Sequence, residues 1–470
     1  MADLGERLRR FWQRYAAGFR TPTRDGSEYA YHYLSGLLRM LHKRTFTNIG
    51  RQTGVAGQNL QHFVSHSPWS AQEVIAQVQA EIAATPGLER GGMLLLDERA
   101  DIKAGDTSAG AGRQHNGRLG SVQMSQVGTF LAYANAEVGL WSWVAGELFL
   151  PEDWFTEEQA ARRQQVGIPA TRVFETKIEL GWKMIQRARV PYEAVACDTL
   201  YGRSVWLRRP LDGAGILYMA EVPATTQVYL SEPVVGVPPR QPGRGAQPTK
   251  LRVLAGQPLE VRQVAQREET LWHRVRVRNT ARGVLEDTFA ARPVWTTYTN
   301  EKGQAAVGPP VREWLVRRVR EDGKRSSALS NAPADASLAR LAWLKCQRYF
   351  VERTTEDAKS ELGWDDLAAQ KYRAWEHHLA LTVLAAWFVA QTKLEWARMA
   401  PRDPLLATQF GMEVLPALST ANVRELLRAV LPLPHLSPQD ATALVIEHLV
   451  NRSRSRSCRL KHRQQLKAPP

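Results

Sequence analysis

Two short apolar runs that each end in an aspartate constrain the fold of this chain most strongly. They are MLLLD, residues 93–97, and YEAVACD, residues 192–198. A continuous apolar run of this length is typical of a central strand that is covered on both faces. Further strand-like runs cover residues 123–135, 140–150 and 216–222. With a helix expected at TKIELGWKMIQRAR, this order predicts an α/β fold in which Asp97 and Asp198 end central strands.

The balance of charge limits the class of partner. The chain has 470 residues, with 62 Lys and Arg against 47 Asp and Glu, and a formal net charge of +15. An excess of this size predicts a polyanionic partner, most often nucleic acid. The three cysteines form no CxxC pair, which fits a reducing cytoplasm and argues against structural zinc. The longest apolar run, LALTVLAAWFVA, is too short to cross a bilayer, so we expect no membrane partner.

Changes in composition divide the chain into regions. The start is helical and basic, and the capping sequence SAQE opens one of its helices. The Pro- and Gly-rich stretch EPVVGVPPRQPGRGAQPTK precedes several strand-like segments, and the chain ends in a basic tail. The predicted regions are a helical DNA-binding region (1–88), a first part of the core (89–224), a β-rich insertion (225–334), a second part of the core (335–400), and a C-terminal helical region with the tail (401–470).

A third acid, Glu352, lies in a predicted long helix from Leu338 to Leu362. Spacings of four and seven residues place Arg348, Glu352 and Lys359 on one face of such a helix. A helix that crosses the edge where two strands end can bring a third carboxylate to that edge. Three clustered carboxylates need a cation, and oxygen ligands favour Mg²⁺ or Mn²⁺. The alternative is a surface helix with salt bridges along its own length.

Several sequence blocks carry a resemblance to a known family. They are LLLDERADIKAGDTSAGAGRQHNGRLGSVQMSQVG, DTLYG, LSNAPADASLARLAWLKCQRYFVERTTEDAKSELG and YRAWEHHLALTVLAAWFV. The chain resembles the DDE transposases of bacterial insertion sequences, also described as DDE superfamily endonucleases, over most of its length. One branch of that family carries a Tyr-x2-Arg-x3-Glu-x6-Lys signature, which Arg348, Glu352 and Lys359 match.

Two positions depart from the pattern of the family. Lys345 stands where the signature has tyrosine. After Asp97 the chain reads ERAD, which makes Glu98 and Asp101 rivals for the role of the first acid. We choose Asp97 because it directly ends the predicted strand.

The resemblance implies a ribonuclease-H-like core that the β-rich insertion interrupts. It implies metal-dependent hydrolysis at transposon ends, followed by attack of the freed 3′-hydroxyl on target DNA. Asp97, Asp198 and Glu352 would be the catalytic residues and the ligands of two Mg²⁺ or Mn²⁺ ions. The implied partner is double-stranded DNA, with a dimer in the synaptic complex, and the implied location is the bacterial cytoplasm at the nucleoid.

Other side chains are candidates for DNA contact. With Arg348, Lys359 and Lys345, they are Arg113, Gln114 and His115 in the loop GAGRQHNGRLG, and the insertion residues Trp295 and Trp272, either of which could stack on a flipped base. A simple hairpin connection is the alternative for the loop, and core packing is the alternative for each tryptophan. Strict alternation in LWHRVRVRN would place Trp272, Arg274, Arg276 and Arg278 on one face of a strand. His377 and His378 are expected in the core.

Three functions are compatible with these features. The first is an active DNA transposase. The second is a captured, catalytically inactive relative that binds DNA, which the ERAD stretch and the missing tyrosine suggest. The third is another ribonuclease-H-like nuclease, against which the large insertion and the seven-residue spacing from Glu352 to Lys359 argue.

Overall fold

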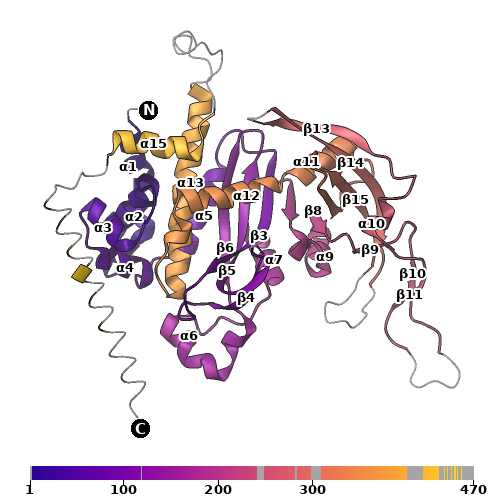
Figure 1. Ribbon diagram of the computed structural model, residues 1–470, viewed down its shortest axis with the longest axis horizontal. Coiled ribbons are helices and arrows are strands. Elements are labelled where there is room, and N and C mark those ends of the chain that lie inside the picture. Colours follow the sequence, from indigo (N-terminus) through magenta and orange to yellow (C-terminus); the bar gives the residue numbers. More distant parts are fainter. Residues whose placement is uncertain are drawn as a thin grey trace.

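The computed structural model describes residues 3–117, 119–240, 248–280, 283–297, 308–399 and 417–432, with scattered residues between 439 and 457. Figure 1 shows the helices of the N-terminal region on one side of the molecule and, on the other, the strands between residues 273 and 319, which continue the central sheet. Most of the predicted basic tail and the middle of the Pro- and Gly-rich stretch lie outside the described residues.

Within the described ranges, ten strands form one mixed sheet. Its order is β13-β14-β15-β16-β8-β7-β3-β5-β4, with β6 paired to β5. Strands β3, β7 and β8 are parallel to one another, and the other neighbours are antiparallel. The strands are β3 (Gly92–Ile102), β4 (Gly112–Asn116), β5 (Ser121–Asn135), β6 (Leu140–Phe149), β7 (Ala194–Cys197), β8 (Leu217–Val222), β13 (His273–Thr280), β14 (Gly283–Thr296), β15 (Val311–Val319) and β16 (Arg325–Ser330). This mixed α/β architecture fits the predicted ribonuclease-H-like core.

Helices cover both faces of the central strands, which explains their continuous apolar runs. On one face lies α7 (Lys177–Arg187), where Gly181 sits so close to the side chain of Leu96 that a Cβ would collide with it. On the other face, α13 (Tyr372–Met399) packs against β6, and Phe130 of β5 stacks on Trp143 with ring centroids 4.4 Å apart. The α7 capping box is formed as the sequence predicts, between Thr176 and Glu179.

The N-terminal region is helical, in agreement with the sequence. Ser70 caps α5 by accepting a hydrogen bond from the backbone N–H of Glu73. His377 contacts two backbone carbonyls of this region, and the hydroxyl of Tyr33 lies 3.0 Å from Nδ1 of His378, so both histidines belong to the core as expected. The helices are α1 (Leu4–Tyr15), α2 (Ser27–Arg39), α3 (Phe46–Thr53), α4 (Gly57–Ser65) and α5 (Ala71–Ala83). Their predicted role in DNA binding stays a prediction.

Short elements connect these parts. The remaining helices are α6 (Ala160–Val166), α8 (Thr199–Gly202), α9 (Val205–Gly213), α10 (Val261–Val264), α11 (Leu338–Cys346), α12 (Tyr349–Glu356) and α15 (Thr420–Val430). The remaining strands form three two-stranded pairs: β1 (Arg20–Thr21) with β2 (Arg24–Asp25), β10 (Val234–Gly236) with β11 (Arg252–Ala255), and β9 (Gln227–Val228) with β12 (Leu259–Glu260). The strands within the predicted insertion join the central sheet, because β16 pairs with β8.

Three local predictions were wrong. Asp97 does not end its strand, because β3 continues to Ile102 in an antiparallel ladder with β5. The long helix predicted from Leu338 is broken between α11 and α12, where successive i→i−3 hydrogen bonds tighten the turn around Arg348. A bulge in β13 between Arg276 and Arg278 interrupts the expected alternation, and Arg278 turns over the ring of Phe350 in α12.

Candidate active site

Three neighbouring parallel strands bring three carboxylates together. Leu96 of β3 is paired with Cys197 of β7, which is paired in turn with Ala220 of β8. The next residues along these strands are Asp97, Asp198 and Glu221. Because register partners in parallel strands share a face, these acids lie side by side. We call Asp97, Asp198 and Glu221 the acidic row.

Helix α12 carries the fourth acid to the acidic row. Glu352 shares one pocket of about 320 Å³ with Asp97 and a larger groove with Asp198 and Glu221, so it lies where the two hollows meet. Its side chain is 65% exposed. Arg348, at the start of α12, lies between the acids. Its Nη2 is 3.7 Å from Oδ2 of Asp97, and its Nη1 is 3.3 Å from Oε1 of Glu352.

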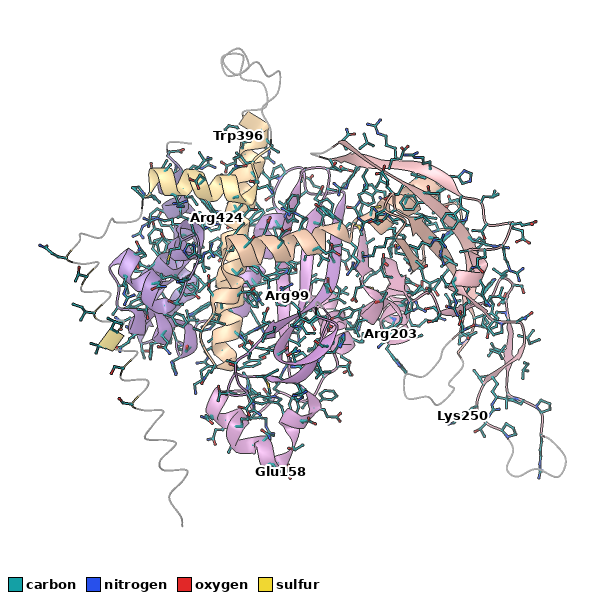
Figure 2. All side chains as sticks on the ribbon, in the orientation of Figure 1. Arg99, Glu158, Arg203, Lys250, Trp396 and Arg424 are labelled. Carbon is teal, nitrogen blue, oxygen red and sulfur yellow. The ribbon has the colours of Figure 1, made fainter. Side chains whose placement is uncertain are left out.

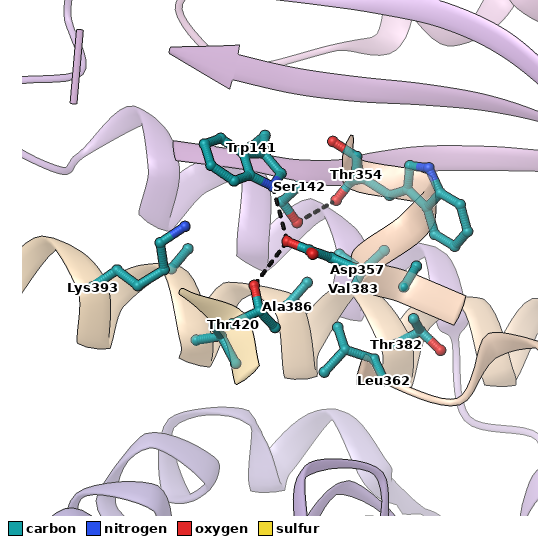
Figure 3. A pocket seen from close by; sticks show the side chains of 14 residues that line it. Trp141, Ser142, Thr354, Asp357, Leu362, Thr382, Val383, Ala386, Lys393 and Thr420 are labelled. Atoms are coloured by element: carbon teal, nitrogen blue, oxygen red, sulfur yellow. Dashed lines mark hydrogen bonds between the residues drawn. The ribbon is translucent and has the colours of Figure 1, made fainter. Parts of the chain in front are cut away.

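The position of α12 is fixed at its far end. The chain leaves α12 through a π-helical turn, Asp357–Glu361. The carboxylate of Asp357 accepts hydrogen bonds from Nε1 of Trp141, at 3.0 Å, and from Oγ1 of Thr420, at 2.8 Å (Figure 3). Nζ of Lys393 lies 4.0 Å from the ring centroid of Trp141, and burial lowers the pKa of that amine to about 8. These contacts tie the helix that carries Glu352 to β6, α13 and α15.

Burial and mutual repulsion shape the electrostatics of the acidic row. Burial raises the pKa of Asp97 to about 7, with a further contribution from the charge of Asp198, while Arg348 opposes the shift. Burial likewise raises the pKa of Asp198, and the charge of Glu98 adds to it. One oxygen of Asp198 caps α8, accepting from the N–H groups of Leu200 and Tyr201. Buried carboxylates that repel one another are stabilised by a cation.

The carboxylate oxygens of the site suit a divalent metal, although the described side chains are not arranged around one ion position. Within the part of the chain that the structure describes, no group of three His, Cys, Asp or Glu side chains stands close enough to hold a metal ion. Carboxylate oxygens are the ligands that Mg²⁺ and Mn²⁺ prefer. Asp97 lies on β3, Asp198 directly follows the neighbouring strand β7, and Glu352 lines one hollow with Asp97 and another with Asp198. The guanidinium of Arg348 lies among these three acids in the structure.

The two rivals of Asp97 have partners of their own. Glu98 points to the opposite face of β3 and forms an ion pair with Lys177 of α7. Asp101 accepts a hydrogen bond from Nε1 of Trp364 at 2.9 Å, and it lies 3.2 Å from Nζ of Lys359. Both contacts favour Asp97 as the first acid, and its role stays a prediction.

The predicted phosphate-binding lysines are both engaged in ion pairs. Lys359 bonds Asp365 at 2.6 Å in addition to Asp101. The side chain of Lys345 is 0% exposed, and its Nζ lies 2.8 Å from Oε1 of Glu221. Lys345 therefore neutralises the third member of the acidic row.

The other predicted DNA contacts lie away from the acidic row. Arg113 and His115 are exposed on β4, at the edge of the sheet, whereas Gln114 bonds backbone carbonyls in a hairpin with β5. Trp295 is partly buried in β14, where its backbone pairs with that of Tyr229. Trp272 is partly buried just before β13. Their roles in DNA contact stay predictions.

A basic groove adjoins the acidic row. It has a volume of about 1210 Å³, and Asp198, Glu221 and Glu352 are among the residues that line it. Figure 2 shows the described side chains on the whole ribbon, those of β13 to β15 among them. The basic groove is lined by Arg278, Arg318, Arg320, Lys324, Arg325 and Arg353, among others.

Sequence reasoning missed Glu221 and most of the basic groove. A signal for Glu221 was present, because ILYMAEV is a third apolar run with an acid near its end. The segment VREWLVRRVRE contributes Arg317, Arg318 and Arg320 to the groove, and its density of arginine was a further signal.

Comparison with protein families gives one match. Residues 14–284, more than half of the chain, match a family described as DDE superfamily endonuclease. The matched region contains the acidic row and ends before Glu352. No curated protein matches the chain. In the described part of the chain, no helix is both long and apolar enough to cross a membrane.

Proposed function

The chain belongs to the DDE superfamily endonucleases, and on that premise we propose that it is a DNA transposase. Membership implies a metal-dependent nuclease that acts on DNA. In the proposed reaction, the protein binds the terminal inverted repeats of a transposon, hydrolyses the phosphodiester bonds at its ends, and joins the freed 3′-hydroxyl groups to target DNA. A dimer in the synaptic complex and a place in the bacterial cytoplasm, at the nucleoid, belong to this proposal.

One observation carries the proposal. The parallel pairing of β3 and β7 sets Asp97 beside Asp198, and Glu352 of α12 lines one hollow with Asp97 and another with Asp198. These are the catalytic residues and metal ligands of the proposal. The raised pKa of Asp97 and of Asp198 supports it, because a cation would relieve the cost of holding both charges.

Each part of the site has a role in the proposed chemistry. Two Mg²⁺ or Mn²⁺ ions, when bound, would stabilise the attacking and leaving oxygens of the in-line displacement. The carboxylates of Asp97, Asp198 and Glu352 would hold them. In hydrolysis, water forms a bond to phosphorus as the bond to the 3′ oxygen breaks, and in strand transfer the 3′-hydroxyl forms that bond instead. Arg348 and the basic groove would bind the phosphates of the duplex.

Cleavage of a plasmid that carries the DNA flanking the gene tests the proposal. We expect cuts at the repeat ends with Mg²⁺ or Mn²⁺ and none without metal, and Glu352→Gln should abolish the cuts while DNA binding remains. Glu356→Gln is the matched control, because Glu356 lies one turn further along α12, is 63% exposed, and pairs with Arg353. Cuts that survive Glu352→Gln would show that the third carboxylate lies elsewhere.

A captured, catalytically inactive relative is the second candidate. The observation that favours it is Arg348, whose guanidinium lies among the acids that would hold the metal. DNA binding without cuts in any metal would support this candidate. Metal-dependent cuts without a preference for the repeat ends would instead support another ribonuclease-H-like nuclease.

A further inference from the structure

Arg348 is surrounded by acids. Its charge interacts with those of Asp97, Glu221, Asp198 and Glu352. Lys345 is hydrogen-bonded to Glu221 at 2.8 Å, and its side chain is fully buried, so this acid already has a partner. Arg348 is therefore the cation that faces the other three acids, Asp97, Asp198 and Glu352.

The contacts of Arg348 are loose compared with those of Lys345. The 3.7 Å from Nη2 to Asp97 exceeds the 2.7–3.2 Å of a normal N–H···O hydrogen bond, and the 3.3 Å from Nη1 to Glu352 is at its limit. The buried Nε of Arg348 has no hydrogen-bond partner among the described residues. Charge attraction, rather than a network of close hydrogen bonds, thus holds this guanidinium in place, and another cation that binds the same acids can take over its role.

We propose that Arg348 is an internal counter-cation that competes with the divalent metal for Asp97, Asp198 and Glu352. In the metal-free protein the guanidinium neutralises these acids, and it leaves them when the metal binds. The inference rests on the proposed function and adds a regulation of the same site. The guanidinium of Arg348 and a metal ion held by the same acids would repel each other, so each weakens the binding of the other to these acids.

The neighbouring groove gives Arg348 a second partner. Arg348 lines the basic groove together with Arg318, and a phosphate bound there can accept two parallel hydrogen bonds from a guanidinium. DNA would then draw Arg348 away from the acids and raise the affinity of the site for metal. By reciprocity, bound metal would raise the affinity for DNA by the same factor. The site would assemble fully only when metal and DNA are both present.

Calorimetric titration with Mg²⁺, without DNA, tests the competition. Arg348→Gln should bind Mg²⁺ about tenfold more tightly than the wild type, within the roughly 5- to 150-fold range usual for coupled sites. Arg340→Gln is the control: it removes the same charge from the preceding helix, α11, but Arg340 pairs with Glu193 and does not line the basic groove, so its Mg²⁺ affinity should equal that of the wild type. Asp97→Asn should abolish binding in each background.

A second titration, with a short DNA duplex present, tests the coupling. DNA should raise the Mg²⁺ affinity of the wild type and leave that of Arg348→Gln nearly unchanged. If Arg348→Gln does not fold, Arg348→Lys replaces it, because the shorter amine reaches fewer of the acids and should still bind Mg²⁺ severalfold more tightly than the wild type.

The outcomes separate the two proposals. Equal or weaker Mg²⁺ binding by the Arg348 variant, with binding still lost in Asp97→Asn, overturns the counter-cation while the metal site stands. An increase as large in Arg340→Gln as in Arg348→Gln also overturns it, because net charge alone would then explain the effect. No Mg²⁺ binding by any protein, with or without DNA, overturns the metal site and the proposed function with it.

Discussion

The buried ion pair between Lys345 and Glu221 offers a quantitative test of how the acidic row is built. The side chain of Lys345 is 0% exposed and that of Glu221 is 19% exposed. Removal of one partner from a buried pair costs about 3–5 kcal/mol, because the other charge is left without compensation. Lys345→Met should cost about 3 kcal/mol, the lower end of that range, since Glu221 keeps some contact with water.

Substitution of the other partner, Glu221, should destabilise the protein more. Glu221→Gln leaves the ammonium group of Lys345 entirely enclosed, so we expect a loss of about 5 kcal/mol. The double variant, Lys345→Met with Glu221→Gln, contains no unpaired charge and should lie within about 1 kcal/mol of the wild type. Urea denaturation followed by tryptophan fluorescence gives the four free energies of unfolding, and their differences give the coupling energy. If the stability losses of the two single variants simply add up in the double variant, the reasoning is refuted.

Three further predictions follow from other parts of the structure. Burial and the charge of Glu147 raise the pKa of Glu376 from 4.5 to about 7, so the folded protein loses stability as the pH rises through that range. Thermal denaturation between pH 5 and pH 8, values that span about this range, should therefore show a smaller fall in Tm for Glu376→Gln than for the wild type, and an equal fall would contradict the assignment. Gly202→Ala would place its Cβ 2.0 Å from the carbonyl oxygen of Glu221, and we expect about 1–3 kcal/mol of destabilisation in the same urea assay; a neutral result would mean that α8 can move. Arg325→Gln, in the basic groove, should weaken binding to all DNA sequences alike and lower the slope of log K against log salt by about one, whereas an unchanged slope would remove Arg325 from the interface.

The sequence predicted those features that depend on local pattern. Apolar runs located β3 and β7, since a strand covered on both faces must be apolar along its whole length. Capping residues located the starts of α5 and α7, because an N-cap hydrogen bond joins residues only three positions apart. Asp97 and Asp198 each follow one of these apolar runs directly. Because the two runs pair in parallel, as β3 and β7, the two acids lie next to each other.

The sequence could not predict features that depend on distant partners. Whether Asp97 ends its strand depends on β5, which pairs with β3 up to Ile102. The face of β13 that carries Arg278 depends on a bulge against β14, and period-two alternation carries no sign of such a bulge. The partner of Glu221 lies 124 positions away at Lys345, so only the folded chain could show that this acid is already neutralised.

The pairing of β16 with β8 has a consequence for the DNA. Ala328 of β16 is the register partner of Glu221, so the strands that bear the basic groove are hydrogen-bonded to the strand that bears the last acid of the row. Neighbouring strands are spaced at about 4.8 Å, and a continuous ladder leaves no hinge at this junction. If the basic groove binds DNA as proposed, the phosphates that it holds and the proposed catalytic carboxylates keep a fixed separation, so any adjustment that brings the scissile bond into place has to come from the duplex. Ends rich in pliable pyrimidine–purine steps would then be processed faster than stiff ones, even at base pairs that no side chain touches.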